Sequence, residues 1–248
     1  MSGHSKWATI KHKKGAKDKA RGKLFSKLIR FIEVAAREGG GDPDANPTLA
    51  TAVQKAKDAQ MPSDTIERAI KRGTGDLDGV TFEEASYEGY GPGGVAFLVT
   101  VLTDNRNRAA ADVRSLFTKN GGSLGEPGSV AWKFTKTGVI IVPADSVDED
   151  DLLELALDAG AEDVESDGST YEVRTEPASF LDVRKQLEAG GVTVEQAEVT
   201  MLPQSTTPVD TGKAAQVLRL VGDLEDVDDV QDVFTDFDIP EEVLVDLL

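Results

Sequence analysis

The spacing of the apolar residues changes near residue 80, and this change limits the folds that are open to the chain. Before it, as in residues 24–38, large apolar residues recur three and four positions apart, the spacing of a helix with one buried face. After it, short runs of valine, leucine and phenylalanine such as Val95–Leu102 alternate with helical stripes, a pattern typical of strands and helices packed together. The sequence therefore predicts an α+β protein with a helical N-terminal part.

The N-terminal part is predicted to contain three helices, of which residues 24–38 form the first. Asn46 and Pro47 begin the second, because asparagine is a favoured N-cap residue and proline is favoured at the first helical position. The third begins near Ser63 or Asp64, and Asp64 forms with Glu67 the pattern of a capping box. Gly73 is expected to end it.

The rest of the chain is predicted to form two sheet-containing domains. Residues 137–205 have the order strand, helix, strand, strand, helix, strand of a ferredoxin-like split fold. One helix, one strand and a short final helix remain after residue 205. One helix and one strand are too little for a domain, so we expect them to complete the sheet that begins near residue 79. Val130–Thr135 is expected to be a further strand. The predicted α+β fold thus has three domains: a helical domain (1–78), a discontinuous domain (79–136 and 206–248), and a ferredoxin-like domain inserted into it (137–205).

Charge is divided unevenly along the chain. The whole sequence has 27 basic and 45 acidic residues, a formal net charge of −18. Residues 1–72 have 16 basic and 8 acidic residues, a net charge of +8, whereas residues 73–248 have 11 and 37, a net charge of −26. Such asymmetry predicts a nucleic-acid contact at the basic end, and the acidic remainder discourages contacts elsewhere.

Residues 1–23 are too polar to pack and are expected to form an extended arm that becomes helical when bound. Their lysines would neutralise backbone phosphates with little base selectivity. Two planar rings, Trp7 and His12, are able to stack on bases. The arm leads directly into the first predicted helix, which would hold it against a fixed surface.

Two further sets of basic residues extend this prediction. Arg106 and Arg108 follow a predicted N-cap, Asp104 or Asn105, where positive charge opposes the helix dipole; this placement favours a binding role. The third helix is the nearest candidate for a recognition helix, although no segment has a readable helix-turn-helix pattern. The predicted nucleic-acid contacts are Lys6, Trp7, Lys11, His12, Lys13, Lys14, Lys17, Lys19, Arg21, Lys23, Lys27, Arg30, Arg68, Lys71, Arg72, Arg106 and Arg108.

Other kinds of chemistry find little support in the sequence. Cysteine is absent, which excludes disulfides and thiolate metal sites, and both histidines, His4 and His12, lie in the first dozen residues. The glycine-rich segment 89–94 lacks the lysine of a phosphate loop and lies between two strands, so we interpret it as a hairpin turn. Acidic runs such as Glu225–Asp229 are interpreted as solvated helix ends. We expect no enzyme activity, no metal and no cofactor.

Cellular setting and partners follow from the same composition. No apolar run approaches the ~18 residues of a membrane span, and the N-terminus lacks the apolar stretch of a signal peptide. We therefore expect a cytoplasmic protein that does not bind membranes, and a monomer. The acidic domains are expected to contact a protein partner or to position the arm.

Several motifs in order along the chain resemble those of the YebC family. That family includes bacterial transcriptional regulators and a mitochondrial translational activator of cytochrome c oxidase. The resemblance is densest in residues 2–135. The matching segments are Ser2–Lys14, Arg21–Arg30, Gly39–Pro43, Met61–Pro62, Ile66–Gly73, Tyr87–Gly94 and Leu102–Arg108.

The resemblance implies a cytoplasmic three-domain α+β protein with a helical N-terminal domain and no known catalytic centre. It also implies a role as a DNA-binding transcriptional regulator, or, for some members, in translation at the ribosome. We therefore predict a non-enzymatic regulator of gene expression that binds DNA through its N-terminal domain. The alternatives are a ribosome-associated translation factor that binds ribosomal or transfer RNA, and a protein–protein adaptor whose basic arm docks on an acidic partner.

Overall fold

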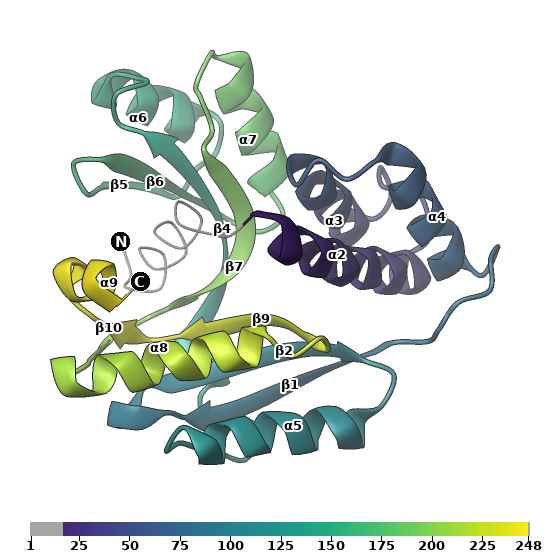
Figure 1. Ribbon diagram of the computed structural model, residues 1–248. Coiled ribbons are helices and arrows are strands. Elements are labelled where there is room, and N and C mark those ends of the chain that lie inside the picture. Colours follow the sequence, from purple (N-terminus) through teal and green to yellow (C-terminus); the bar gives the residue numbers. More distant parts are fainter. Residues whose placement is uncertain (1–16, 248) are drawn as a thin grey trace. The chain divides into compact units, whose positions relative to one another are not determined.

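The computed structural model describes residues 17–247, and these divide into two compact units (Figure 1). One unit is Phe134–Leu202, and the other combines the described residues before it with those from Pro203 onward. The described residues form an α+β protein with an N-terminal helical region, two four-stranded sheets and one two-stranded sheet. The predicted domain boundary near residue 78 falls inside one of these units and stays a prediction.

The helical region contains α2 (Lys17–Gly39), α3 (Pro47–Asp58) and α4 (Ser63–Thr74). Their apolar stripes meet in one core, in which Ile32 of α2 and Leu49 of α3 are fully buried. Asn46 caps α3 as predicted: its side-chain oxygen accepts from the Leu49 N–H at 3.1 Å, and its side-chain nitrogen donates to the Ala35 carbonyl at 2.8 Å. This one side chain therefore begins α3 and ties it to α2.

Three details of the helical prediction were wrong. Helix α2 begins at Lys17, so residues 17–23 are helical and not an extended arm; their alanine, arginine and lysines are good helix formers. Helix α4 has Pro62 at its N-cap position and no capping side chain, because Asp64 lies in its first turn and pairs with Arg68 instead.

The third detail concerns the end of α4. The helix continues past Gly73 to Thr74, and its C-cap residue is Gly75, which has the left-handed φ of 88°. Gly73 instead allows α4 to lie close against α2, because a Cβ there would come within 2.5 Å of the Glu33 carbonyl oxygen.

The first sheet has the order β3-β1-β2-β9, in which all neighbouring strands are antiparallel. Strands β1 (Glu83–Tyr90) and β2 (Ala96–Thr103) form the predicted hairpin around the 3-10 turn Pro92–Gly94. The edge strands are β3 (Ser123–Leu124) and β9 (Val230–Thr235). Strand β9 lies after the other unit in the sequence, so the unit Phe134–Leu202 is inserted into this sheet domain, as predicted.

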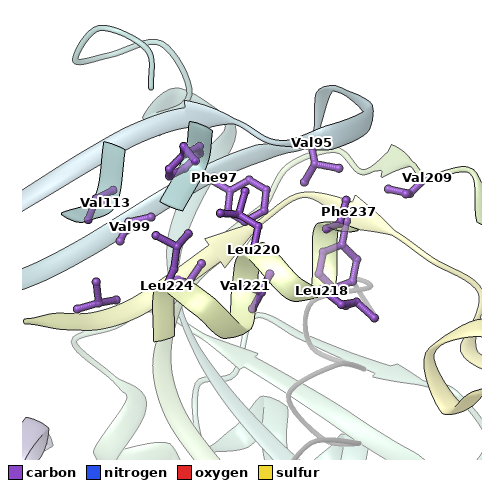
Figure 2. Close-up of a cluster of buried hydrophobic side chains, with 14 of the residues drawn as sticks. Val95, Phe97, Val99, Val113, Val209, Leu218, Leu220, Val221, Leu224 and Phe237 are labelled. Atoms are coloured by element: carbon purple, nitrogen blue, oxygen red, sulfur yellow. The ribbon is translucent and has the colours of Figure 1, made fainter. Parts of the chain in front are cut away.

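Helices α5 (Arg106–Lys119) and α8 (Thr211–Glu225) share a core with this sheet (Figure 2). Phe97 of β2 and Phe117 of α5 are fully buried and meet edge to face, with ring centroids 5.5 Å apart. Leu220 and Leu224 of α8 reach the same core from the far end of the chain. The C-terminal segment adds the short parallel pair β8 (Thr207–Pro208) and β10 (Phe237–Asp238), followed by α9 (Glu241–Leu247).

The predicted strand Val130–Thr135 is wrong over its first four residues, because the strand begins only at Phe134, and a buried carboxylate explains why. Ala131–Lys133 form a 3-10 turn. The Glu88 side chain accepts hydrogen bonds from the N–H groups of Gly128 at 2.6 Å, and of Val130 and Ala131 at 2.7 Å each. Burial would raise the pKa of Glu88, but these three bonds outweigh it and hold the pKa below its ordinary value. The amides that a strand would need are thus already used.

The inserted unit has the ferredoxin-like order that the sequence predicts. Its helices are α6 (Glu149–Asp158) and α7 (Phe180–Ala189). Its strands pair in the order β5-β6-β4-β7 around a core that includes Ile140, Leu152 and Phe180. The strands are β4 (Phe134–Pro143), β5 (Asp163–Ser166), β6 (Thr170–Thr175) and β7 (Gln196–Pro203).

The two four-stranded sheets share one layout with different starting points. In the inserted unit, β4 and β5 are joined by α6 and do not pair with each other, because β6 lies between them. In the first sheet, β2 and β3 are joined by α5, and β1 lies between them in the same way. The other neighbour of β4 is β7, and the other neighbour of β2 is β9. The first sheet is therefore a permuted form of the second, in which the intervening strand comes first in the chain.

We expect residues 134–203 to fold alone, because they contain all four strands, both helices and the core of the inserted unit. Residues 79–133 should remain unfolded alone, because α8 and β9 supply the missing part of their core. Circular dichroism during heating checks both fragments. A cooperative transition in 79–133, or its absence in 134–203, would show that the division is wrong.

Candidate nucleic-acid interface

Three basic side chains of α2 lie one turn apart and contact the segment that joins α8 to β9. These are Lys23, Lys27 and Arg30, and the segment is Glu225–Asp229, hereafter the acidic segment. The spacing of four and three residues places them on one face of the helix. All these residues belong to the same compact unit.

The two lysines bind at the C-terminal end of α8. The Lys27 ammonium donates to the Glu225 carbonyl oxygen at 3.0 Å. Lys23 donates to the Asp226 carbonyl oxygen and, at 3.0 Å, to the Asp226 carboxylate. The last carbonyls of a helix lack intrahelical partners and carry the negative end of its dipole, so two cations are stabilised there.

Arg30 and Arg108 share one carboxylate. The Asp229 side chain is 7% exposed and accepts from Arg30 at 3.1 Å, from Arg108 at 2.7 Å and from the Thr103 hydroxyl at 2.9 Å. Arg30 also donates to the Asp228 carbonyl oxygen at 2.6 Å. The acidic segment thereby joins α2 to β2 and to the start of α5.

Asp229 remains ionised in this setting. Burial would raise the pKa of Asp229, but the hydrogen bonds from Arg108 and Thr103, with the charges of Arg108 and Arg30, outweigh it and lower the pKa. The same contacts raise the pKa of Arg108. Both partners therefore keep their charge at neutral pH.

These contacts correct our interpretation of Glu225–Asp229 as a solvated helix end. The Asp226 side chain is 83% exposed, but Asp229 is nearly buried and holds two arginines. The sequence shows the acidic run, yet its partners lie about 200 positions earlier on α2, so no local pattern could connect them. Thr103 was missed for the same reason.

Arg106 and Arg108 occupy the first turn of α5, and Asn105 caps it by accepting from the Arg108 N–H at 3.1 Å. Asp104 pairs with Arg108 at 2.7 Å, and Asp229 adds a second negative charge, so the cost of positive charge at this helix start is offset. Arg106 is 61% exposed and lies 3.7 Å from Glu83.

The basic residues of α4 have different surroundings. Arg72 pairs with the nearly buried Glu33 and so helps α4 pack on α2. Arg68 is 61% exposed and pairs with Asp64 in the preceding turn. Lys71 is exposed. Because Asp64 and Glu67 place negative charge on the exposed first half of α4, this helix is poorly suited to enter a groove lined by phosphates.

The remaining predicted contacts lie at the start of the chain. Arg21 is exposed near the beginning of α2, with its guanidinium 5.3 Å from the centre of the Phe25 ring. Lys17 and Lys19 belong to the first turn of α2. The others lie outside the described residues: Lys6, Trp7, Lys11, His12, Lys13 and Lys14.

Among residues 17–247, no group of three or more histidine or carboxylate side chains is arranged to hold a metal ion. In the same part of the chain, no helix is long and apolar enough to cross a membrane.

Comparison with known proteins identifies the family. A family model described as the TACO1/YebC protein N-terminal domain matches residues 5–76, and one described as the TACO1/YebC second and third domain matches residues 82–237. The chain belongs to the TACO1/YebC family. Both the helical region and the two four-stranded sheets fall within the matched residues.

Two relatives and one solved structure are similar to the chain over nearly its whole length. A protein of Rubrobacter xylanophilus, named a probable transcriptional regulatory protein, is 59% identical over all of this chain and 99% of its own length. A protein of Desulfatibacillum aliphaticivorans with the same name is 57% identical over 98% of this chain and 99% of its own. The crystal structure of a conserved hypothetical protein from Aquifex aeolicus matches with a TM-score of 0.83 and 51% identity, over 95% of this chain and 97% of that one.

Replacing Asp229 with Asn should lower the free energy of unfolding at pH 7 by about 1–3 kcal/mol, because the hydrogen bonds to a charged group are weakened. A carboxylate with a lowered pKa stabilises the fold above its unfolded pKa of about 3.9, and this stabilisation is lost as the pH falls through the folded pKa. The difference between wild type and D229N should therefore shrink below about pH 4. Urea unfolding at several pH values checks this.

Asp104→Asn is the matched control for that experiment. Asp104 pairs with the same Arg108 but is 43% exposed, so its loss should cost less than about 0.5 kcal/mol. Equal losses for the two variants, or a loss in D229N that stays constant down to pH 3, would show that Asp229 is not the centre of this contact.

Proposed function

We propose that this TACO1/YebC protein is a non-enzymatic regulator of gene expression that binds nucleic acid through its basic N-terminal region, and that it acts as a DNA-binding transcriptional regulator. The division of charge carries the proposal: residues 1–72 have a net charge of +8 and the rest −26. Phosphates are attracted to the one part and repelled by the other. The name of the Rubrobacter and Desulfatibacillum relatives, probable transcriptional regulatory protein, agrees with it.

The binding region in this proposal consists of the arm before α2 and the basic face of α2. Four lysines lie in residues 2–16, and Lys23, Lys27 and Arg30 continue the positive charge along the helix. Lysine is a point charge that suits phosphates, whereas the planar fork of arginine suits guanine edges. The protein should therefore bind the nucleic-acid backbone with little preference for sequence. A cytoplasmic location belongs to the same proposal.

A ribosome-associated translation factor is the second candidate. Binding by phosphate contacts and ring stacking suits structured RNA as well as DNA, and the acidic first half of α4 argues against a helix that reads bases in the major groove. In this case the target would be ribosomal or transfer RNA. The two candidates differ in the nucleic acid and share the binding region.

Deleting residues 2–16 should remove most of the affinity for nucleic acid and leave α2 and the core intact. The deletion removes Lys6, Lys11, Lys13 and Lys14, and each phosphate contact on duplex DNA contributes about −0.9 to the slope of log K against log salt concentration. The slope should thus become shallower by about 3 to 4. Fluorescence anisotropy of a labelled duplex over a salt series measures it. An unchanged slope would refute binding through the arm.

Two substitutions should separate backbone contact from stacking. Replacing Lys13 and Lys14 with Ala should weaken binding to duplex DNA, single-stranded RNA and a structured RNA by similar factors. Replacing Trp7 with Ala should weaken binding to single strands more, because stacking on an open base contributes about 1–3 kcal/mol. Competition assays with the three nucleic acids measure both. If the double lysine variant lost binding to one sequence only and bound the others normally, a backbone mode of binding would be contradicted.

A further inference from the structure

We propose that the acidic segment Glu225–Asp229 masks the basic face of α2 and must leave it before nucleic acid can bind there. This inference rests on the proposed function, because it concerns the regulation of the same binding region. The mask is part of the chain itself, so the affinity for nucleic acid depends on how firmly the segment is held.

The contacts of the segment resemble those that a nucleic-acid backbone would make. Lys23, Lys27 and Arg30 each donate to oxygen atoms of the segment at 2.6–3.1 Å, either carbonyl or carboxylate. A row of negative oxygens along a basic helix face is also what a phosphate backbone presents. The two ligands therefore need the same donors and cannot occupy them together.

The strength of the mask differs along the segment. At one end, the pair of Lys23 and Asp226 is open to solvent, with side-chain exposures of 32% and 83%, and such pairs contribute little. At the other end, Asp229 is 7% exposed and is also held by Arg108 and Thr103. Release should therefore begin at Asp226 and Lys23, next to the lysine-rich start of the chain.

A nucleic acid can compete because it offers more charge than the segment does. The segment neutralises three basic residues, whereas a duplex also engages the lysines before α2 and releases counterions at each contact. Binding by the arm would raise the local concentration of phosphates beside Lys23 and favour the exchange. The mask would thus disfavour short anions that cannot reach both regions.

The test is the substitution Asp226→Asn in the full-length protein, with anisotropy of a labelled DNA duplex and a labelled single-stranded RNA as the readout. Removing this carboxylate should raise the affinity by about two- to fivefold, the range expected for one exposed ion pair. Asp158→Asn is the matched control, because Asp158 is an exposed acidic residue of α6 and its loss changes the net charge equally. The control should raise the affinity less.

The variant Lys23→Ala distinguishes masking from a local charge effect. If Asp226 acts by holding Lys23, its effect requires Lys23. In the K23A background, D226N should then change the affinity for nucleic acid no more than D158N does. Hydrogen exchange gives a second measurement: nucleic acid should speed the exchange of the Asp226 N–H, which donates to the Gly222 carbonyl oxygen at the end of α8.

The outcomes separate the two proposals. If the wild type binds nucleic acid but D226N and D158N have the same affinity, masking is overturned and the proposed function stands. The same holds if D226N raises the affinity as much in the K23A background as in the wild type. If neither the wild type nor any variant binds DNA or RNA, both proposals are overturned. Unchanged exchange of the Asp226 N–H in the bound state would also overturn masking.

Discussion

The carboxylate of Asp229 is the contact on which the arrangement of the larger unit depends. It accepts hydrogen bonds from Arg30 of α2, Arg108 of α5 and Thr103 of β2, while its backbone carbonyl accepts from the Leu102 N–H at 2.8 Å. A nearly buried carboxylate is tolerated only where its charge is compensated. Two arginines from distant parts of the chain supply that compensation, and in doing so they fix α2 against the acidic segment.

A second buried carboxylate secures the return of the chain from the inserted unit. Asp236 is fully buried, accepts from the Ala96 N–H at 2.7 Å and the Thr207 hydroxyl at 2.9 Å, and pairs with Lys133. Lys133 immediately precedes the inserted unit, and Thr207 follows it closely. The Asp236 side chain thus binds one residue just before and one just after the 69-residue insertion Phe134–Leu202. It thereby holds together the two chain segments that enter and leave the inserted unit.

Much of the fold could be predicted from the sequence because local patterns specify it. Asn46 caps α3, the segment 89–94 turns a hairpin, and the order of elements in the inserted unit is ferredoxin-like, as their residues indicate. The errors arose where a distant partner overrides the local pattern. Glu88 binds the amides of Val130 and Ala131, so the strand that was predicted from Val130 begins only at Phe134. Arg30 and Arg108 pair with Asp229, so the acidic run is not a solvated helix end. The same is true of the candidate site. Composition indicates the basic end of the chain, but only the structure reveals that three of its basic residues contact the acidic segment.

The acidic and basic parts of the chain thus have related roles in this account. The acidic remainder disfavours nucleic acid over most of the surface, and its segment Glu225–Asp229 occupies α2 until a stronger ligand arrives.

Ultraviolet crosslinking in living cells, with identification of both the crosslinked peptides and the nucleic acid attached to them, tests the central claim most directly. The account predicts crosslinks confined to peptides from residues 1–72, with the attached DNA or RNA naming the target. Crosslinks confined to the acidic sheet domains, or none at all, would contradict it.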